Sequence, residues 1–485
     1  MDNFQEIISR VTGPATEWLA GINDWLYTFV MIVALVGTGL WFTFRTRGVQ
    51  IRHFGNMVRY MAQSRQGADG GISSFQAFAM GLATRVGIGN VTGVALAMIL
   101  GGPGALFWMW VVALVGMATA FAEAVLAQLF KRRHPDGTFR GGPAYYIKAG
   151  LKSQTLAVIF AVSMVFALSV AMPMVQSNTI AGVLSASHGV PSWVTGLVVA
   201  GLAALVIFAG VRGVARVTEI VSPAMALAYI VLAIAVTVVN FRQLPLFFQD
   251  VFLAAFGLRE ALFGTAGGLL AALLNGTRRG LFSNEAGMGT NPNAAATATV
   301  AHPVQQGMIQ SFGVFVDTIL VCSATGFIIL TSGMLDLQRL GADDSAHLTA
   351  DAIVGSLGSW VTIPLSIIIF FFGFSSVLGA YAYANANIVF LGGNAIADWA
   401  VRISVVLCSF IGAVLALTFV WTLMDTAMFV VTVVNLVALV KLSKWVVAAL
   451  RDYERQKAQG GEISFDPVAA GFPSDLDCSA WQVAE

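Results

Sequence analysis

Long apolar segments recur along this chain, and they constrain its fold more than any other feature. An α-helix needs about 20 mostly apolar residues to cross the hydrocarbon core of a bilayer. About eleven segments of this kind follow one another with short polar connections. Aromatic residues gather at several of their ends, which is typical of membrane interfaces. The pattern predicts an all-α membrane protein whose spans run near residues 25–44, 73–100, 105–130, 155–186, 193–211, 217–240, 262–287, 304–332, 360–391, 399–419 and 422–441.

Charged residues are scarce over all 485 positions. Asp, Glu, Lys and Arg make up 11% of the chain, and its mean hydropathy is +0.80, whereas soluble proteins carry about 25% charged residues. This number of charged residues is too small to cover the surface of a soluble protein of this size. Lipid must therefore cover much of the surface of this protein. The net charge of +1 provides no basic field for nucleic acid. Cys322, Cys408 and Cys478 form no CxxC pattern or disulfide framework.

Basic residues predict the orientation of the chain. Lys and Arg accumulate after the first, third, fifth and last segments, whereas loop 333–351 holds four Asp residues against Arg339 alone. Because short loops rich in Lys and Arg stay in the cytoplasm, we expect the N-terminus outside and the C-terminus inside. Residues 442–485 are expected to form a cytoplasmic tail, with an amphipathic stretch followed by disorder.

Two apolar segments are interrupted by glycines and polar residues. Residues 84–93 place Arg85, Asn90 and three glycines inside the second segment, and residues 279–289 interrupt the seventh in a similar way. Glycine costs about 1 kcal/mol relative to alanine at a helical position, so both stretches are predicted to unwind. Irregular backbone at membrane depth is tolerated only where protein or a watery cavity satisfies it. Paired interruptions of this kind indicate a midplane transport site.

The two interruptions lie five segments apart, which indicates an internal repeat. When the first segment is set aside, segments two to six and seven to eleven form two halves of five helices each. An odd number of spans per half forces the halves into opposite membrane orientations. We therefore predict an extra N-terminal helix with a basic loop (1–72), a first repeat (73–240), a second repeat (241–441) and the tail (442–485).

Three motifs resemble those of the alanine or glycine:cation symporter family, the sodium:alanine symporters. They are GGPGALFWMW at 101–110 with GMAT at 116–119, GGPAYY at 141–146, and GLFSNEAGMG at 280–289. The resemblance implies a leucine-transporter-type fold of 5+5 inverted repeats and symport of alanine or glycine into the cell by alternating access. It also implies Na⁺ as the coupling ion, no organic cofactor, and a plasma membrane location, the inner membrane in a bacterium.

A zwitterionic amino acid needs partners for both its carboxylate and its ammonium group. Half-helix N-termini offer free N–H groups to a carboxylate, and unwound carbonyls suit an ammonium or Na⁺. The alternatives are structural, because glycines also serve helix packing and membrane serines often bond back to their own helix. The expected substrate-binding residues are Gly87, Gly89, Asn90, Val91, Phe282, Ser283 and Asn284, together with Gln176, where the family places a glutamine.

The resemblance to the leucine-transporter fold also implies a sodium site between the first and eighth helices of the repeats. Na⁺ prefers several oxygen ligands, some of them from the backbone. The residues that match are Thr84, Gly87, Asn90, Ser375 and Ser376.

Charged side chains inside apolar segments need partners, because an isolated charge at that depth is costly. Pairing of Arg85 or Arg279 with Glu123, Glu285 or Asp317 would neutralise these charges, and the sequence does not determine which residues pair. Gating pairs, a proton relay and static structural pairs are all compatible with the sequence.

Two other classes of membrane protein compete with a sodium symporter. A proton-coupled or exchange-mode carrier of the same fold is favoured if the buried carboxylates titrate. A membrane-embedded enzyme would need a nucleophile–base pair or a metal cluster, and the sequence shows neither pattern, so we expect no enzymatic activity and no metal besides sodium. The partners expected are an amino acid and membrane lipids, and not nucleic acid.

Overall fold

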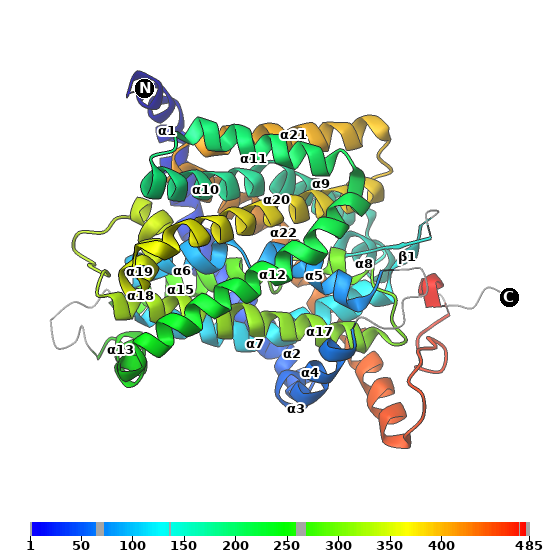
Figure 1. Cartoon of the computed structure of the whole chain (residues 1–485). Helices are drawn as coiled ribbons and strands as arrows, with labels where there is room; N and C mark the ends of the chain where they lie inside the picture. Colours follow the sequence, from blue (N-terminus) through cyan, green and yellow to red (C-terminus); the bar gives the residue numbers. More distant parts are fainter. Residues whose placement is uncertain (1, 65–71, 135–136, 259–267, 475, 482–485) are drawn as a thin grey trace.

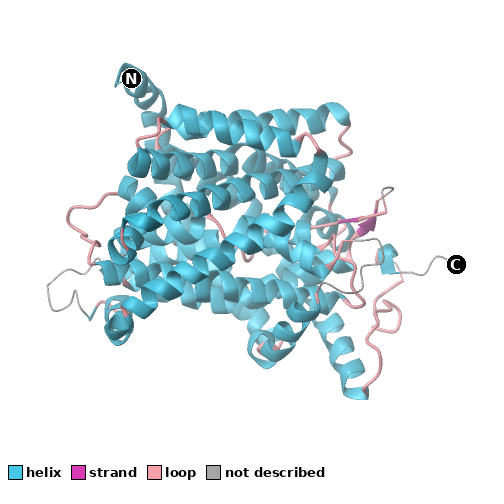
Figure 2. Cartoon of the chain, in the orientation of Figure 1, coloured by secondary structure: helices cyan, strands magenta, loops and turns pink. Residues whose placement is uncertain are grey.

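Helices form nearly all of the structure, as the apolar segments predict (Figure 2). The computed structural model describes residues 2–64, 72–134, 137–258, 268–474 and 476–481. Within these ranges, the strands are limited to a short antiparallel hairpin of β1 (Arg132–Arg133) and β2 (Phe139–Arg140).

The α-helices before residue 260 include both short connecting turns and long apolar rods. They are α1 (Asp2–Leu26), α2 (Ile32–Arg45), α3 (Val49–Arg52), α4 (Phe54–Gln63), α5 (Ser74–Arg85), α6 (Val94–Gly101), α7 (Gly104–Leu129), α8 (Pro143–Gly150), α9 (Gln154–Phe166), α10 (Met172–His188), α11 (Ser192–Ile207), α12 (Gly210–Val239) and α13 (Leu244–Ala255).

The α-helices of the remaining chain are fewer and on average longer. They are α15 (Gly268–Asn284), α16 (Pro292–Ala295), α17 (Pro303–Val314), α18 (Ser323–Ser332), α19 (Ser345–Leu357), α20 (Thr362–Phe390), α21 (Ala395–Val414) and α22 (Leu417–Gln459). Wider π-helical turns join several neighbours: η1 (Tyr27–Met31), η2 (Gly89–Gly93), η3 (Ala167–Ala171) and η5 (Phe315–Cys322). Short 3₁₀ turns complete the set: η4 (Phe241–Gln243), η6 (Ala342–Asp344), η7 (Ser359–Val361) and η8 (Ser479–Trp481).

Among the described residues, seven helical segments are long and apolar enough to cross a membrane, and a bent pair makes an eighth. The bent pair is α5 with η2–α6, whose axes differ by 48°. Three further predicted segments, 25–44, 193–211 and 262–287, coincide at least in part with the shorter helices α2, α11 and α15, and residues 259–267 lie outside the described part. The seven are Gly104–Leu129, Gln154–His188, Gly213–Val239, Pro303–Ser332, Ser359–Phe390, Ala395–Val414 and Leu417–Gln459.

The long helices pack in layers around the two interrupted segments (Figure 1). Helices α10, α11 and α21 lie side by side, and α7 packs against both α15 and α17 in another group. Helix α20 contacts α5, α10 and α12. The interrupted segment α5–η2–α6 and the second half of α15 therefore lie inside the bundle, and every residue from Ala77 to Ile99 is buried.

The connections gather at two opposite ends of the bundle. Helix α8, the β1–β2 hairpin and the C-terminal segment lie at one end (right in Figure 1), and α13 and the α18–α19 connection lie at the other. The basic loop after α7 and the acidic loop before α19 are therefore at opposite ends, as the charge alternation requires.

The prediction of a disordered tail is wrong for its described residues. Helix α22 continues to Gln459, and residues 460–474 and 476–481, here called the C-terminal segment, fold back onto the end of the bundle. Phe465, Phe472, Leu476 and Cys478 are buried there. These scattered apolar residues lack the helical spacing of a span, so their burial was not visible in the sequence.

Candidate functional site

The first interruption opens a gap of three residues between α5 and η2. The chain leaves the helix at Val86, whose ψ of 92° is extended. Asn90 then closes the gap, because its Oδ1 accepts a hydrogen bond from the Gly87 N–H at 3.0 Å. A side chain at Gly87 would meet the Ser376 hydroxyl, since a Cβ would lie 2.7 Å from its Oγ. The glycines thus let other elements approach the unwound backbone closely.

The second interruption begins later than predicted. Helix α15 continues through Arg279 to Asn284, and irregular backbone then extends to the short helix α16. Glu285, Gly287 and Gly289 have φ values of +55°, +87° and +80°, a conformation that glycine adopts without steric cost. The motif therefore breaks the helix only in its second half.

Glu123 of α7 holds this unwound backbone. Its two carboxylate oxygens accept hydrogen bonds from the N–H groups of Gly287 and Gly289, each at 3.0 Å. Asn435 of α22 donates to Glu123 at 2.6 Å and to the Gly287 carbonyl at 2.9 Å, and Tyr146 donates to Asn435. The carboxylate replaces the helical partners that the break removes.

Asp317 of η5 joins the two interruptions. Its Oδ1 accepts a hydrogen bond from the Asn90 side chain at 2.6 Å, and its Oδ2 accepts one from the Ser283 hydroxyl at 2.9 Å. Thr318 donates to the same Oδ2 at 2.7 Å. Asp317 is fully buried, and Cys322 lies beside both donors. One carboxylate is thus shared by residues from both interrupted helices.

A second carboxylate, that of Glu285, lies at the start of the unwound stretch. Its Oε2 accepts hydrogen bonds from Thr84 at 3.2 Å, Thr290 at 2.6 Å and Asn291 at 2.9 Å. The Thr84 hydroxyl thus lies within hydrogen-bond distance of Glu285 and of the Gly81 carbonyl, and its hydrogen-bond partners within the described part of the chain do not include the serines of α20. Thr84 connects the end of α5 to the second interruption.

Ser375 and Ser376 of α20 face the carbonyl end of α5. The Ser376 hydroxyl shares its one proton between the Ala83 carbonyl at 2.9 Å and the Phe372 carbonyl at 3.0 Å, and the Ser375 hydroxyl donates to the Phe372 carbonyl at 3.1 Å. Each hydroxyl has one proton and two lone pairs, so lone pairs remain available to a cation. The buried oxygens from α5 and α20 fit the ligand chemistry of Na⁺, and Thr84 and Asn90 are engaged elsewhere.

The direct contacts of the buried arginines differ from the pairings that the sequence suggested. Within the described residues, Arg279 pairs with Asp425 of α22 at 2.7 Å, a residue that we did not predict. Arg85 donates from Nη1 to the carbonyl and side-chain oxygens of Gln310, both at 3.1 Å. Neutral donors bind Glu123, Glu285 and Asp317 directly in place of an arginine.

Phe282 packs against the first interruption on one side and contacts Trp421 and Arg279 on another. A Cβ at Gly89 would lie 3.2 Å from the Phe282 ring. The centres of the Phe282 and Trp421 rings are 4.6 Å apart, and the Arg279 guanidinium carbon lies 4.6 Å from the centre of the Trp421 ring. Trp421 and Asp425 lie one turn apart at the start of α22. Asp425 could have been found from the sequence, because it is a charged residue inside the predicted span 422–441. Nothing in the sequence indicated a role for Trp421.

Three remaining predicted residues differ in how much bonding capacity they leave free. Gln176 of α10 is buried, and its Oε1 has no hydrogen-bond partner among the described residues. The same holds for Nδ2 of Asn284, whose Oδ1 accepts from the Ala286 N–H. The Val91 carbonyl instead accepts a hydrogen bond from Thr349 at 3.1 Å. Gln176 and Asn284 therefore have capacity for a ligand.

The family described as "Sodium:alanine symporter family" matches residues 13–467. The chain belongs to the sodium:alanine symporter family. This sodium:alanine symporter family member is therefore a multi-pass membrane transporter and not an enzyme.

Several relatives of this family member match almost end to end. "Probable sodium/glutamine symporter GlnT" of Bacillus subtilis (strain 168) is 40% identical, over 99% of this chain and 98% of the relative. "Amino-acid carrier protein AlsT" of the same organism is 40% identical, over 95% and 96%. "Sodium/alanine symporter AgcS" of Methanococcus maripaludis is 36% identical, over 89% of this chain and 96% of the relative. Two of these names specify an amino acid, glutamine or alanine, and the third says only that the protein carries amino acids.

Proposed function

We propose that this protein is a sodium-coupled symporter that carries small neutral amino acids, alanine and glycine, into the cell by alternating access. The observation that carries the proposal is the Asp317 carboxylate, which binds Asn90 of the first interruption and Ser283 of the second. A transport site between two interrupted helices requires the conformational changes of the two helices to be coupled. The relative named for alanine supports alanine, and the relative named for glutamine makes glutamine the main competitor.

For the fold we propose eleven spans in a leucine-transporter-type 5+5 inverted repeat, preceded by one extra helix. The units are residues 1–72, 73–240, 241–441 and 442–485. The support is the spacing of the two interruptions and the separation of basic and acidic loops to opposite ends of the bundle. We propose a plasma membrane location with the N-terminus outside. A reporter fused at residue 46 or 133 should then read cytoplasmic, and one at residue 343 should read external.

For the coupling ion we propose that the hydroxyls of Ser375 and Ser376 and the Ala83 carbonyl hold Na⁺ next to Gly87. All are buried oxygens at the junction of α5 and α20. Thr84 and Asn90 act indirectly in this proposal, because their side chains fix the backbone around the interruption.

For the substrate we propose that the unwound backbone of Gly87, Gly89 and Val91 and the end of α15 receive the zwitterion. The free Oε1 of Gln176 suits the ammonium group, and the free Nδ2 of Asn284 suits the carboxylate. Phe282 lies over Gly89 and limits the size of the side chain. Asn90 and Ser283 hold Asp317, which fixes both halves of the site.

For the outer gate we propose the layer formed by Arg279, Asp425, Trp421 and Phe282. The ion pair joins α15 to α22 and the aromatic pair lies directly beside it. Opening this layer requires the Arg279–Asp425 pair to separate.

A proton-coupled carrier of the same fold is the second candidate. Glu285 and Asp317 are buried carboxylates that face the interruptions without an arginine partner within 4.0 Å among the described residues. One Bacillus subtilis relative, 39% identical, carries the words "sodium/proton-dependent alanine carrier" in its name. The coupling ion therefore needs a direct test.

The test is uptake of radiolabelled alanine by proteoliposomes under an inward Na⁺ gradient, an inward H⁺ gradient, or neither. We expect accumulation with Na⁺ that survives a proton ionophore, and competition by glycine. Accumulation driven by H⁺ alone would support the second candidate. Stronger competition by glutamine than by glycine would overturn the small-substrate assignment.

A further inference from the structure

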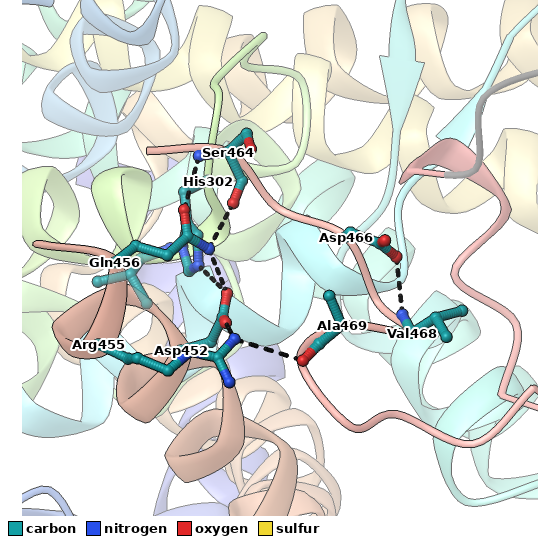
Figure 3. A network of polar contacts seen from close by, with 9 residues as sticks. His302, Asp452, Arg455, Gln456, Ser464, Asp466, Val468 and Ala469 are labelled. Atoms are coloured by element: carbon teal, nitrogen blue, oxygen red, sulfur yellow. Dashed lines mark hydrogen bonds and ion pairs between the residues drawn. The ribbon is translucent and has the colours of Figure 1, made fainter. Parts of the chain in front are cut away.

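The C-terminal segment is fixed at its start by contacts with α22. Gln456 and Ser464 exchange two hydrogen bonds, of 2.8 and 3.0 Å. Asp452 contacts both Gln456 and His302, and the Arg455 guanidinium reaches the Ala469 carbonyl (Figure 3). His302 precedes α17, so this network ties the segment to the loop that follows the second interruption.

Trp481 fixes the other end of the C-terminal segment. Its indole N–H donates to the Gln128 carbonyl at 2.8 Å. The Lys131 ammonium lies between the Trp481 and Phe139 rings, 4.7 and 4.1 Å from their centres. It donates to Gln128 at 2.7 Å and to the Ala298 carbonyl at 2.9 Å. The segment thus bridges the end of α7 and the same loop.

Between these two anchors, the segment reaches the edge of a basic pocket. Arg132 donates to the Asp477 carboxylate and, at 3.0 Å, to the Ser479 hydroxyl. Both side chains of the Arg132–Asp477 pair are 41% exposed, so solvent and other anions can reach it. The pocket encloses about 230 Å³ and is lined by Arg132, Tyr145, Lys148, Ala149, Val389 and Phe390.

The pocket has a basic side and an apolar side. Arg132 and Lys148 supply two positive charges, and Val389 and Phe390 are the last residues but one and the last of the apolar helix α20. The tail supplies one carboxylate to Arg132, and Lys148 has only the Phe390 ring, at 5.7 Å, as a described contact. The single carboxylate of Asp477 therefore compensates one of the two positive charges of the pocket. The other half is available to a larger oxyanion.

We propose that this pocket binds the phosphate of an anionic phospholipid, and that the phosphate competes with Asp477 for Arg132 and so loosens the C-terminal segment. A phosphodiester accepts paired hydrogen bonds from a guanidinium and a point charge from a lysine at once. The apolar wall at the end of a spanning helix suits the glycerol and the first methylenes of the lipid. Basic pockets at the cytoplasmic ends of spanning helices bind such headgroups.

The buried thiol of Cys478 provides the readout, because it becomes accessible when the segment loosens. Its exposure in the docked state is 1%. The full-length protein is placed in nanodiscs of phosphatidylcholine alone or with phosphatidylglycerol, and the rate of maleimide labelling is measured. The Cys478→Ser variant measures the background from Cys322 and Cys408, which are also buried. We expect phosphatidylglycerol to raise the rate about two- to fivefold, the range for losing one half-exposed ion pair.

Matched variants separate the pocket from general charge effects. Lys148→Gln should abolish the response to phosphatidylglycerol and leave the rate in phosphatidylcholine unchanged, because Lys148 does not contact the segment. Arg133→Gln removes the same charge next to Arg132 but outside the pocket, and should keep the response. Asp477→Asn should label fast in both lipids.

Three results would overturn the proposal. The first is an equal labelling rate in the two lipids, and the second is a full response in Lys148→Gln. The third is the same acceleration in phosphatidylcholine when inorganic phosphate is added, because the site would then take free phosphate and not a headgroup. None of these results depends on which amino acid the protein carries.

Discussion

Arg279 and Asp425 lie 2.7 Å apart, from Nη2 to Oδ2, although 146 residues separate them in the chain. Their side chains are only 7% and 13% exposed, so neither charge is well solvated alone. Removing one partner of a buried pair costs about 3–5 kcal/mol, and we expect Asp425→Asn to reduce the initial rate of alanine uptake at least tenfold. Asp398→Asn is the matched control, because Asp398 pairs with Arg402 away from the interruptions. Wild-type uptake in Asp425→Asn would remove this pair from the gate.

Glu123→Gln tests the support of the second interruption. Glutamine has one acceptor oxygen where Glu123 uses two, so the N–H of Gly287 or of Gly289 would lose its partner. An unsatisfied buried donor costs about 1–3 kcal/mol, and we expect a lower melting temperature together with loss of uptake. Unchanged melting and transport would contradict the role of Glu123 as the partner of the unwound backbone.

The double variant Ser375→Ala, Ser376→Ala tests the sodium site. We expect the Na⁺ concentration for half-maximal alanine uptake to rise about tenfold, which corresponds to roughly 1.4 kcal/mol of lost ion binding. Ser409→Ala is the control, since Ser409 is a buried serine that bonds back to Val405 in α21. An unchanged Na⁺ dependence in folded double variant would exclude both hydroxyls as ligands.

Gln176→Ala tests recognition of the zwitterion. Hydrogen bonds to charged groups contribute about 1.5–3 kcal/mol, so we expect alanine and glycine to bind at least tenfold more weakly, and to similar extents because they share the ammonium group. Gln306→Ala serves as the control, because the amide of Gln306 is also buried, has no hydrogen-bond partner in the described part of the chain, and lies on α17. A loss confined to one of the two amino acids would place Gln176 at the side chain.

Acid should loosen the C-terminal segment through His302. Burial lowers the pKa of His302 from 6.5 to about 4, against a smaller opposing effect of Asp452. A histidine with a lowered pKa in the docked form stabilises that form fully above pH 6.5, and the stabilisation is lost as the pH falls toward 4. The population of the loosened form should rise by up to about tenfold per pH unit in that window. It is measured as the Cys478 labelling rate divided by the rate of a fully exposed thiol at the same pH, because maleimide reacts with the thiolate, whose fraction falls with pH. His302→Gln should flatten the response, and His347→Gln, at the opposite end of the bundle, should keep it.

The sequence predicted those features that depend on local backbone chemistry. The glycines at 87, 89 and 93 predicted the first interruption, and the helix does end at Arg85. The second interruption was placed too early because packing overrides local preference: Gly280 lies against Met109 of α7, and Arg279 pairs with Asp425. Helix α15 therefore continues where its composition favours unwinding.

The partners of the buried charges could not be predicted, because they depend on the register between helices distant in the chain. Glu123 binds backbone N–H groups 164 and 166 residues away. No pattern of side chains in the sequence indicates which backbone N–H groups will bind a given carboxylate. Ser375 and Ser376 were found only through the family resemblance. Whether they bind Na⁺ stays a prediction.

Helix α22 extends without a break over 43 residues, from the Trp421–Asp425 turn to the Asp452–Gln456 network. At 1.5 Å per residue its length is about 65 Å, and it contains no proline. Because the helix is unbroken, the ion pair with Arg279 and the network that anchors the C-terminal segment belong to one continuous element. A displacement of Asp425 would therefore be passed along the helix backbone to Asp452.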